Sequence, residues 1–162
     1  VFVVSSRVYC FEFEYVPMDA ARGIPESFSA VFPAKIPWGD RGVKADSIWV
    51  EDNLYWARIL YRPKEFEMKR MNVFYSSAVH SSQGTGEAPV QDGLEAKSEA
   101  LRDSLKQAVR NMLRPSVPNK PARITGRALL AEDPYTIIAA GQYRCTARFF
   151  ITVENVKEYS VR

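Results

Sequence analysis

The stretch from residue 93 to residue 114 constrains the fold more than any other, because it carries a long helical pattern in a chain otherwise patterned for strands. Asp92 and Glu95 have the spacing of a capping box, and Pro115 marks the end of the helix. Its apolar residues recur at helical spacing and form one stripe: Leu94, Leu101, Leu105, Ala108, Val109, Met112 and Leu113. A helix with one apolar stripe needs another layer to bury it, and the surrounding strands provide that layer.

The strand pattern is clearest at residues 8–16, where aromatic side chains alternate with Glu12 and Glu14. Further strands are expected at residues 28–32, 47–50, 54–62, 69–79, 122–131 and 142–153. The 162 residues show no fixed-period repeat and no second core behind a long linker. We therefore predict one α+β domain over residues 1–162, a mainly antiparallel β-sheet of about six strands with one long amphipathic helix, at about residues 93–114, packed against it.

A change of composition separates the strands from the helix. Residues 81–89 contain no large apolar side chain, and Gly84, Gly86 and Pro89 interrupt any regular pattern. Such a segment has little to bury, so we predict a flexible loop at about residues 81–92.

The residues that most often carry catalysis or bind metals are few. His80 is the single histidine and stands beside the predicted loop, where a solvent-facing position is expected rather than a catalytic one. Cys10 and Cys145 lie in strands, where two free buried thiols are favoured over a disulfide, although pairing across the sheet stays open. The sequence therefore predicts no catalytic residue, no cofactor and no metal site.

Positive charge is concentrated in one part of the chain. Residues 102–127 contain seven Lys and Arg but one acidic residue, Asp103. Alternation along the strands and the helix gathers arginines on shared faces, which is typical of surfaces that bind phosphates. The candidate nucleic-acid contacts are Arg110, Arg114, Arg123, Arg127, Arg144 and Arg148. A solvated basic surface without function is the simpler interpretation of the same pattern.

Large aromatic side chains crowd the region between residues 38 and 61. The segment from Leu54 to Tyr61 has bulky groups on both strand faces, and residues 51–53 before it predict a hairpin with a three-residue loop. One helix covers one side of a sheet, so the second apolar side needs a loop, a second sheet or another subunit. We predict that the hairpin contributes a partner contact through Trp49, Tyr55, Trp56 and Tyr61.

These observations predict a non-enzymatic structural or interaction subunit of a larger assembly, whose partners are protein subunits, identical or different. A domain that binds single-stranded DNA or RNA through an arginine-rich sheet face is the alternative, and an enzyme with a carboxylate-based site is the third hypothesis. From about Lys69 onward, the order of strand, loop, amphipathic helix and hairpin is similar to that of small assembly proteins such as the tail-terminator proteins of tailed phages. No membrane insertion is expected. The compartment stays open, because the chain begins with Val1 and a targeting segment can have been removed.

Overall fold

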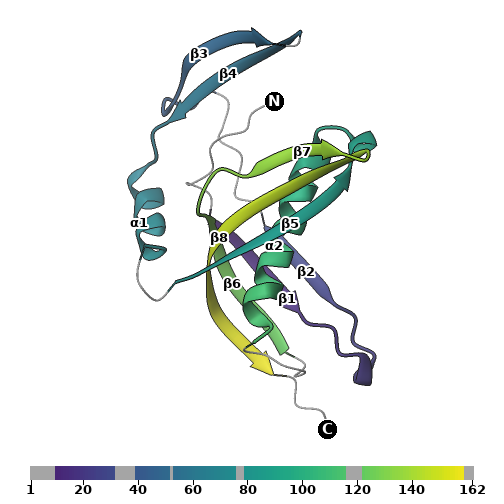
Figure 1. The fold of residues 1–162 in the computed structure, drawn as a ribbon. Coiled ribbons are helices and arrows are strands. Elements are labelled where there is room, and N and C mark those ends of the chain that lie inside the picture. The colour runs from purple at the N-terminus through teal and green to yellow at the C-terminus, as the bar shows by residue number, and fades with distance from the viewer. Residues whose placement is uncertain (1–9, 32–38, 52, 76–78, 116–121, 159–162) are drawn as a thin grey trace.

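The computed structural model describes residues 10–31, 39–51, 53–75, 79–115 and 122–158. It shows an α+β fold in which a long helix packs against an antiparallel six-stranded sheet, as the sequence predicts (Figure 1). The strands are β1 (Cys10–Val16), β2 (Ser27–Val31), β3 (Val43–Glu51), β4 (Leu54–Tyr61), β5 (His80–Pro89), β6 (Ala122–Leu130), β7 (Tyr135–Ala139) and β8 (Gln142–Glu158). The helices are α1 (Glu65–Val73) and α2 (Glu95–Leu113), with short 3-10 turns η1 (Ala20–Arg22) and η2 (Val90–Asp92).

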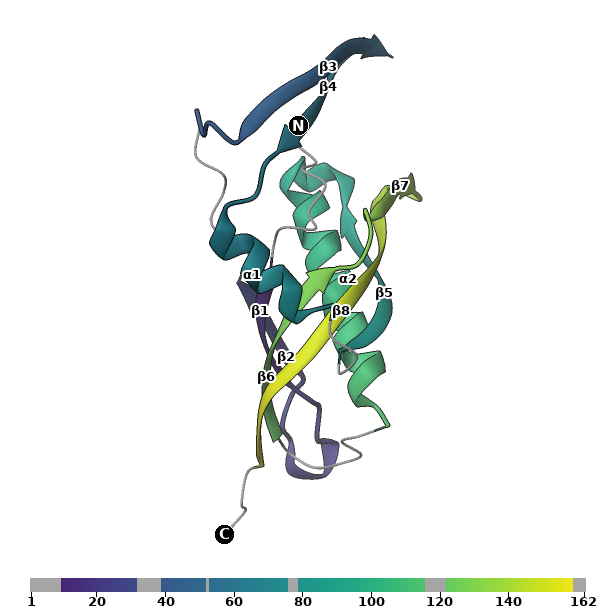
Figure 2. The same cartoon turned by 90° about the vertical axis from the view of Figure 1, so that its left-hand side faces the viewer.

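The main sheet has the strand order β2, β1, β6, β8, β5, and β7 pairs with the first part of β8. Strand β8 is the spine of this sheet, because its first part lies between β5 and β7 and its last part pairs with β6. Figure 2 shows β8 running along much of the length of the molecule. Alternate side chains of β8 therefore face α2 on one side of the sheet and the outer face on the other.

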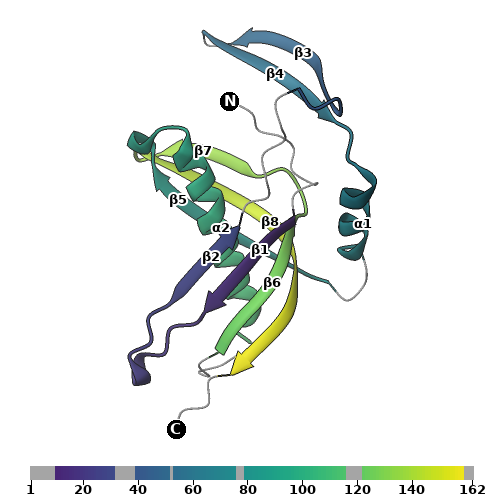
Figure 3. The same ribbon diagram turned by 180° about the vertical axis from the view of Figure 1, so that it is seen from behind.

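The core lies between α2 and one face of the sheet, and Figure 3 shows β1, β2 and β6 from the side away from α2. Helix α2 presents a row of small buried side chains to the sheet: Ala96, Ala100, Ser104 and Ala108. Larger side chains, among them Leu105, Phe149 and Ile151, fill the remaining space. Small residues at every fourth position bring the helix close to the strands.

The prediction of a flexible loop at residues 81–92 is wrong. His80–Pro89 forms β5, which pairs with β8 along its whole length and lies under α2. Gly84 and Gly86 face the helix, and a Cβ atom at either position would overlap backbone atoms of Ser104. The glycines therefore allow an approach of strand and helix that any larger side chain would prevent, and this is the reason that the segment lacks large apolar residues.

Helix α2 also begins without the predicted capping box. Asp92 ends the short turn η2, and Gly93 adopts a φ of 75°, so the chain changes direction between Asp92 and the helix. Leu94 occupies the N-cap position, makes no side-chain capping hydrogen bond and is exposed. The buried stripe therefore begins at Ala96 rather than at Leu94.

The strand predicted at residues 69–79 is wrong as well, because residues Glu65–Val73 form α1. The carboxylate of Glu67 accepts a hydrogen bond from the backbone N of Lys64 at 2.6 Å, which stabilises the first turn. The i, i+4 ion pair between Glu65 and Lys69 adds to this at 2.9 Å. Good helix formers thus outweighed the alternating pattern that suggested a strand.

A polar network ties the hairpin of β1 and β2 to α2. The hydroxyl of Tyr15 donates a hydrogen bond to Glu26 at 2.9 Å, and Lys106 of α2 pairs with the same carboxylate at 2.9 Å. Burial, followed by the hydrogen bond to Glu26, raises the pKa of Tyr15 to about 12. Burial opposes the ionisation of Glu26, but the hydrogen bonds from Lys106 and Tyr15 prevail and lower its pKa. The network therefore keeps Tyr15 protonated and Glu26 charged.

Candidate protein-interaction site

Strands β3 and β4 form a separate two-stranded sheet, residues 43–61, here called the arm, which stands away from the main sheet (Figure 1, Figure 2). Its register pairs Glu51 with Leu54, and Asn53 adopts a positive φ of 59°. Asn is among the residues that accept this conformation in tight hairpin turns. The predicted hairpin is therefore present, with a tighter turn than the expected three-residue loop.

One side of the arm, here called the tryptophan face, carries a cross-strand pair of indoles. Trp49 and Trp56 lie opposite each other, and their rings stack with centroids 6.3 Å apart and planes inclined by 12°. The alternation of the two strands places the following residues on this face: Lys44, Ser47, Trp49, Trp56, Arg58 and Leu60. The two indoles thus lie next to Arg58, with Lys44 further along the same surface, and both rings remain exposed.

The other side of the arm, here called the uncharged face, carries no charged side chain at its paired positions. Its residues are Val43, Ala45, Ile48, Val50, Tyr55, Ala57, Ile59 and Tyr61. Because the register shifts between Ala45 and Ser47, the face includes Val43 and Ala45 before the shift and Ile48 and Val50 after it. The side chain of Tyr55 is 85% exposed, that of Ile48 69% and that of Val50 61%. Large apolar side chains normally reach the surface singly, so a whole exposed apolar face is unusual.

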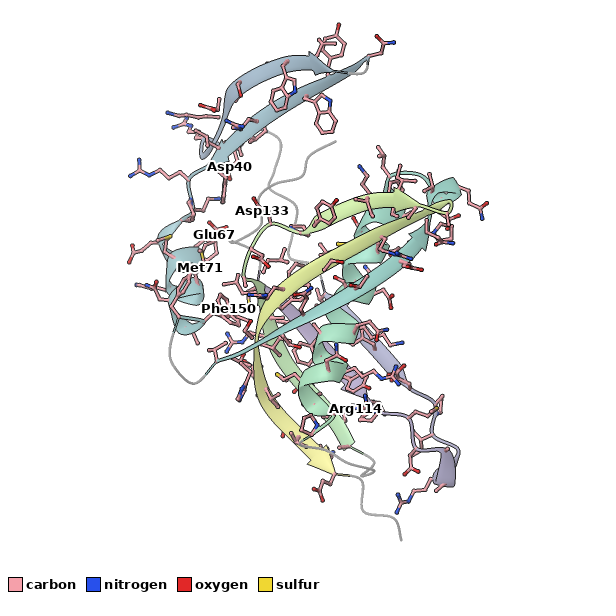
Figure 4. The ribbon with its side chains drawn as sticks, in the orientation of Figure 1. Asp40, Glu67, Met71, Arg114, Asp133 and Phe150 are labelled. Atoms are coloured by element: carbon pink, nitrogen blue, oxygen red, sulfur yellow. The ribbon has the colours of Figure 1, made fainter. Side chains whose placement is uncertain are left out.

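Polar contacts attach the base of the arm to the segment around α1 (Figure 4). The hydroxyl of Tyr61 donates to Glu67 at 3.0 Å, and Lys64 pairs with Asp40 at 2.9 Å. The backbone amide of Gly42, followed by Lys64, holds the pKa of Asp40 below its usual value. Tyr61 is half-buried in this arrangement. Of the four predicted contact residues, Tyr61 therefore belongs to the attachment, whereas the other three are exposed on the arm.

Helix α1 connects the arm to the outer face of the main sheet. Figure 4 shows Met71 on the side of α1 turned toward Phe150 of β8. The ring of Tyr75, which follows α1, packs edge-on against the ring of Phe150 with centroids 6.2 Å apart. Phe66 and Met68 of α1 are exposed. Apolar exposure thus continues from the arm onto α1.

The six arginines predicted as nucleic-acid contacts do not gather into one free basic surface. Carboxylates lie beside five of them: Glu26 at 3.9 Å from Arg110, Glu14 at 3.4 Å from Arg123, Glu154 beside Arg127, Glu87 at 2.7 Å from Arg144 and Glu132 at 3.7 Å from Arg148. Strands β6 and β8 do pair, but Arg127 lies opposite Thr152, four residues along β8 from Arg148. Arg114 is exposed at the end of α2 (Figure 4). The positive charge is therefore divided and largely compensated.

The other residues with chemical potential lie apart from one another. His80 is exposed at the start of β5, as predicted. Cys10 is half-buried and Cys145 is buried, and burial raises the pKa of Cys145. Nowhere in the described part of the chain do three or more His, Cys, Asp or Glu side chains gather as they do around a metal ion.

Glu12 and Glu14 line an open hollow on the outer face of the sheet, together with Glu154. Two of these three carboxylates are already paired with arginines of β6.

Apolar residues on the arm and on α1 extend the predicted contact set: Ile48, Val50, Leu60, Phe66 and Met68. For Ile48 and Val50 the signal in the sequence is the absence of charge at alternate positions of the two strands, a pattern that indicates an apolar face without saying whether it is buried. No helix of the described ranges has the length and apolar character needed to cross a bilayer.

Comparison with known proteins places the chain in a family without indicating an activity. A protein-family profile matches residues 1–159, so the chain belongs to that family, whose description states no activity, ligand or partner. A protein of Treponema pallidum (strain Nichols), described as uncharacterized, is 21% identical over 162 residues, which cover 99% of this chain and 67% of that protein. No solved structure matches the chain.

Proposed function

We propose that the chain is a non-enzymatic structural or interaction subunit of a larger protein assembly, and that the arm is its docking element. The observation that carries the proposal is the exposure of large apolar side chains on both faces of the arm. Alternate residues of a strand point to opposite sides, so the arm has two faces to cover. The long helix packs against the main sheet and covers neither of them. A partner protein supplies that cover.

The energetics of the arm support this function. A two-stranded hairpin alone in water is marginally stable, because it has no third layer against which to bury its apolar side chains. Covering an exposed aromatic or aliphatic side chain contributes roughly 1.5–3 kcal/mol before the costs of association. Tyr55, Ile48 and Val50 together therefore supply enough apolar contact for the centre of an interface.

The arrangement of charge gives less support to nucleic-acid binding. Phosphate binding needs arginines whose charge is available to the ligand, and five of the six candidates lie beside carboxylates of the same chain. Most exposed aromatic side chains lie on or near the arm, and Tyr135, opposite Thr146 of β8, is a single exposed ring near Arg144 and Arg148, both of which lie beside carboxylates.

The experiment compares two double variants in an extract of the source cells. Ile48→Ser/Tyr55→Ser removes apolar contact from the arm, and the matched control Tyr135→Ser/Ile138→Ser makes the same chemical changes at exposed positions of β7. We expect the wild type and the control to run in a nuclease-resistant assembly on native sizing, and the arm variant to run at the mass of the free chain.

Circular dichroism of the purified variants checks that all remain folded. A wild-type chain that runs as a monomer in the extract, an assembly that dissolves with nuclease, or equal release of both double variants would each contradict the proposed function.

A further inference from the structure

Strand β4 presents an open edge with few of the features that usually protect one. Among the described strands it pairs only with β3. It is continuous over Leu54–Tyr61, has neither Pro nor Gly, and contains one charged residue, Arg58. The outer strand edge of β3 differs, because it carries a register shift and the charged residues Lys44 and Asp46. Edges protected in that way resist pairing, whereas an edge like that of β4 accepts another strand.

The hydrogen bonding at the base of the arm shows which groups of β4 are available. The backbone N of Arg62 donates to the carbonyl of Gly42 at 2.8 Å, so Arg62 is turned toward β3. Direction alternates along an antiparallel strand, and Tyr55, Ala57 and Ile59 therefore direct their backbone N–H and C=O groups away from β3. These residues also belong to the uncharged face of the arm.

We infer that a second copy of this chain pairs with β4, strand against strand and antiparallel, so that the two arms form one four-stranded sheet in the order β3, β4, β4, β3. The inference rests on the proposed function, in which the arm is the docking element. Antiparallel pairing of two identical strands is two-fold symmetric and closed, so it ends at a dimer of arms rather than continuing into a fibre.

The single charge on β4 selects the register. Cross-strand neighbours must belong to the same face, so the symmetry axis passes through a residue of β4 rather than between two residues. A register centred on Arg58 would place two guanidinium groups directly opposite each other. A register centred on Ala57 avoids this and places Arg58 beside the partner's Trp56, where cation and ring attract.

The same register is favourable on the uncharged face. Tyr55 then lies opposite the partner's Ile59. Two small Ala57 side chains meet at the centre, where there is least room. A second copy therefore matches the edge of β4 in shape and in charge, and its own uncharged face continues that of the first copy. A strand pair of this length buries less than the roughly 1,200 Å² of a standard interface, so we expect a dissociation constant on the order of micromolar for the arms alone.

Two alanine-to-proline variants test the pairing, because proline removes one backbone N–H and is tolerated at open edges. Ala57→Pro removes an N–H from the outer edge of β4. Ala45→Pro removes one from the outer edge of β3, since alternation from Gly42 turns Ala45 away from β4. Sedimentation equilibrium of the purified full chain should show dimers for the wild type and for Ala45→Pro, and at least tenfold weaker dimerisation for Ala57→Pro.

A cysteine cross-link gives a second measurement in case proline disturbs the hairpin itself. In a chain with Cys10→Ser, the Ala57→Cys variant should form an intermolecular disulfide under mild oxidation, because directly opposite Cα atoms in an antiparallel pair are about 4.5–5.5 Å apart. Ala45→Cys is the matched control and should remain a monomer on a non-reducing gel. The buried Cys145 is common to both variants.

Every outcome separates this inference from the proposed function. A wild-type chain that is monomeric at all concentrations, or equal cross-linking at positions 45 and 57, would overturn the pairing through β4. If the Ile48→Ser/Tyr55→Ser chain were nevertheless released from the native assembly, the proposed function would stand with a different protein as partner. If that chain stayed in the assembly, the proposed function itself would fail.

Discussion

Strands β5 and β4 have opposite compositions and opposite positions in the molecule. Strand β5 has no large apolar side chain, yet it pairs along its length with β8 and lies under α2. Strand β4 is rich in leucine and aromatic residues, yet it pairs only with β3 among the described strands and exposes both faces. The strand that looks like a loop is part of the core layer, and the strand that looks like core is on the surface.

This difference between β5 and β4 shows that the burial of a strand depends on how closely the neighbouring layer can approach it, as well as on its own apolar area. A helix that presents Ala100, Ser104 and Ala108 approaches a strand closely only where the strand offers glycine. Large apolar side chains need a partner layer at a greater distance, and the arm has none within the described chain. Four measurements test this difference between the core layer and the arm.

The largest effect is expected for Gly86→Val in β5. The added side chain would overlap backbone atoms of Ser104 and Ala100, so the helix must move away from the sheet. We expect a loss of at least about 3 kcal/mol in the free energy of unfolding, measured by urea denaturation. The control Thr85→Val lies on the outer face of the same strand and should cost less than about 1 kcal/mol. Equal losses would show that β5 does not lie closely under α2.

The second effect compares one leucine in each region. Leu105 of α2 is 1% exposed and Leu60 of the arm is 54% exposed. Leu105→Ala leaves a cavity in the core and should cost about 2–5 kcal/mol of unfolding free energy. Leu60→Ala should cost less than about 1 kcal/mol, because its side chain is already largely in water. A large loss at Leu60 in the isolated chain would place the arm in the cooperative core.

The third effect concerns two tyrosines. Tyr15→Phe removes the hydrogen bond to Glu26 and should cost about 1 kcal/mol, whereas Tyr55→Phe should leave stability unchanged. Because the pKa of Tyr15 is raised to about 12 in the folded chain, its contribution is complete below pH 10 and is lost as the pH rises toward 12. Urea denaturation across this range should show a steeper loss for the wild type than for Tyr15→Phe. Parallel pH profiles would contradict the role of Tyr15.

The smallest effect is expected for Ala57→Val, which enlarges a side chain of β4 as Gly86→Val enlarges one of β5. Position 57 is exposed on the arm, and valine favours strands, so the unfolding free energy of the monomer should change by less than about 0.5 kcal/mol. Thermal unfolding at low protein concentration measures this. A loss comparable with that of Gly86→Val would show that the arm is packed and not exposed.

Periodicity correctly predicted the elements in which the spacing of apolar side chains favours a single backbone conformation. The helix around Leu105, the strand around Phe13 and the hairpin around Trp56 follow from spacings that favour one backbone conformation. The same argument predicted that aromatic residues of the arm contact a partner, because bulky groups on both faces of a strand are visible in the order of residues, and Trp49, Tyr55 and Trp56 are exposed.

Four features were missed, two because of the local backbone and two because of packing between distant segments. The capping box at Asp92 failed because Gly93 redirects the chain, and α1 formed through local capping by Glu67 where alternation suggested a strand. The glycines of β5 resembled those of a loop, since a requirement for close approach and a requirement for flexibility select the same residue. The compensation of the arginines likewise depends on which strands are neighbours.

The sequence by itself determined that this chain forms one α+β fold with a long helix, and that its aromatic hairpin is apolar on both sides, because periodicity and side-chain volume are properties of neighbouring residues. Only the tertiary structure decided that β5 belongs to the sheet and that the arm stands outside it. The reason is that both outcomes depend on which surfaces meet. Ala100 and Ser104 fit against Gly86 at short distance, whereas no surface among the described residues matches the exposed faces of the arm.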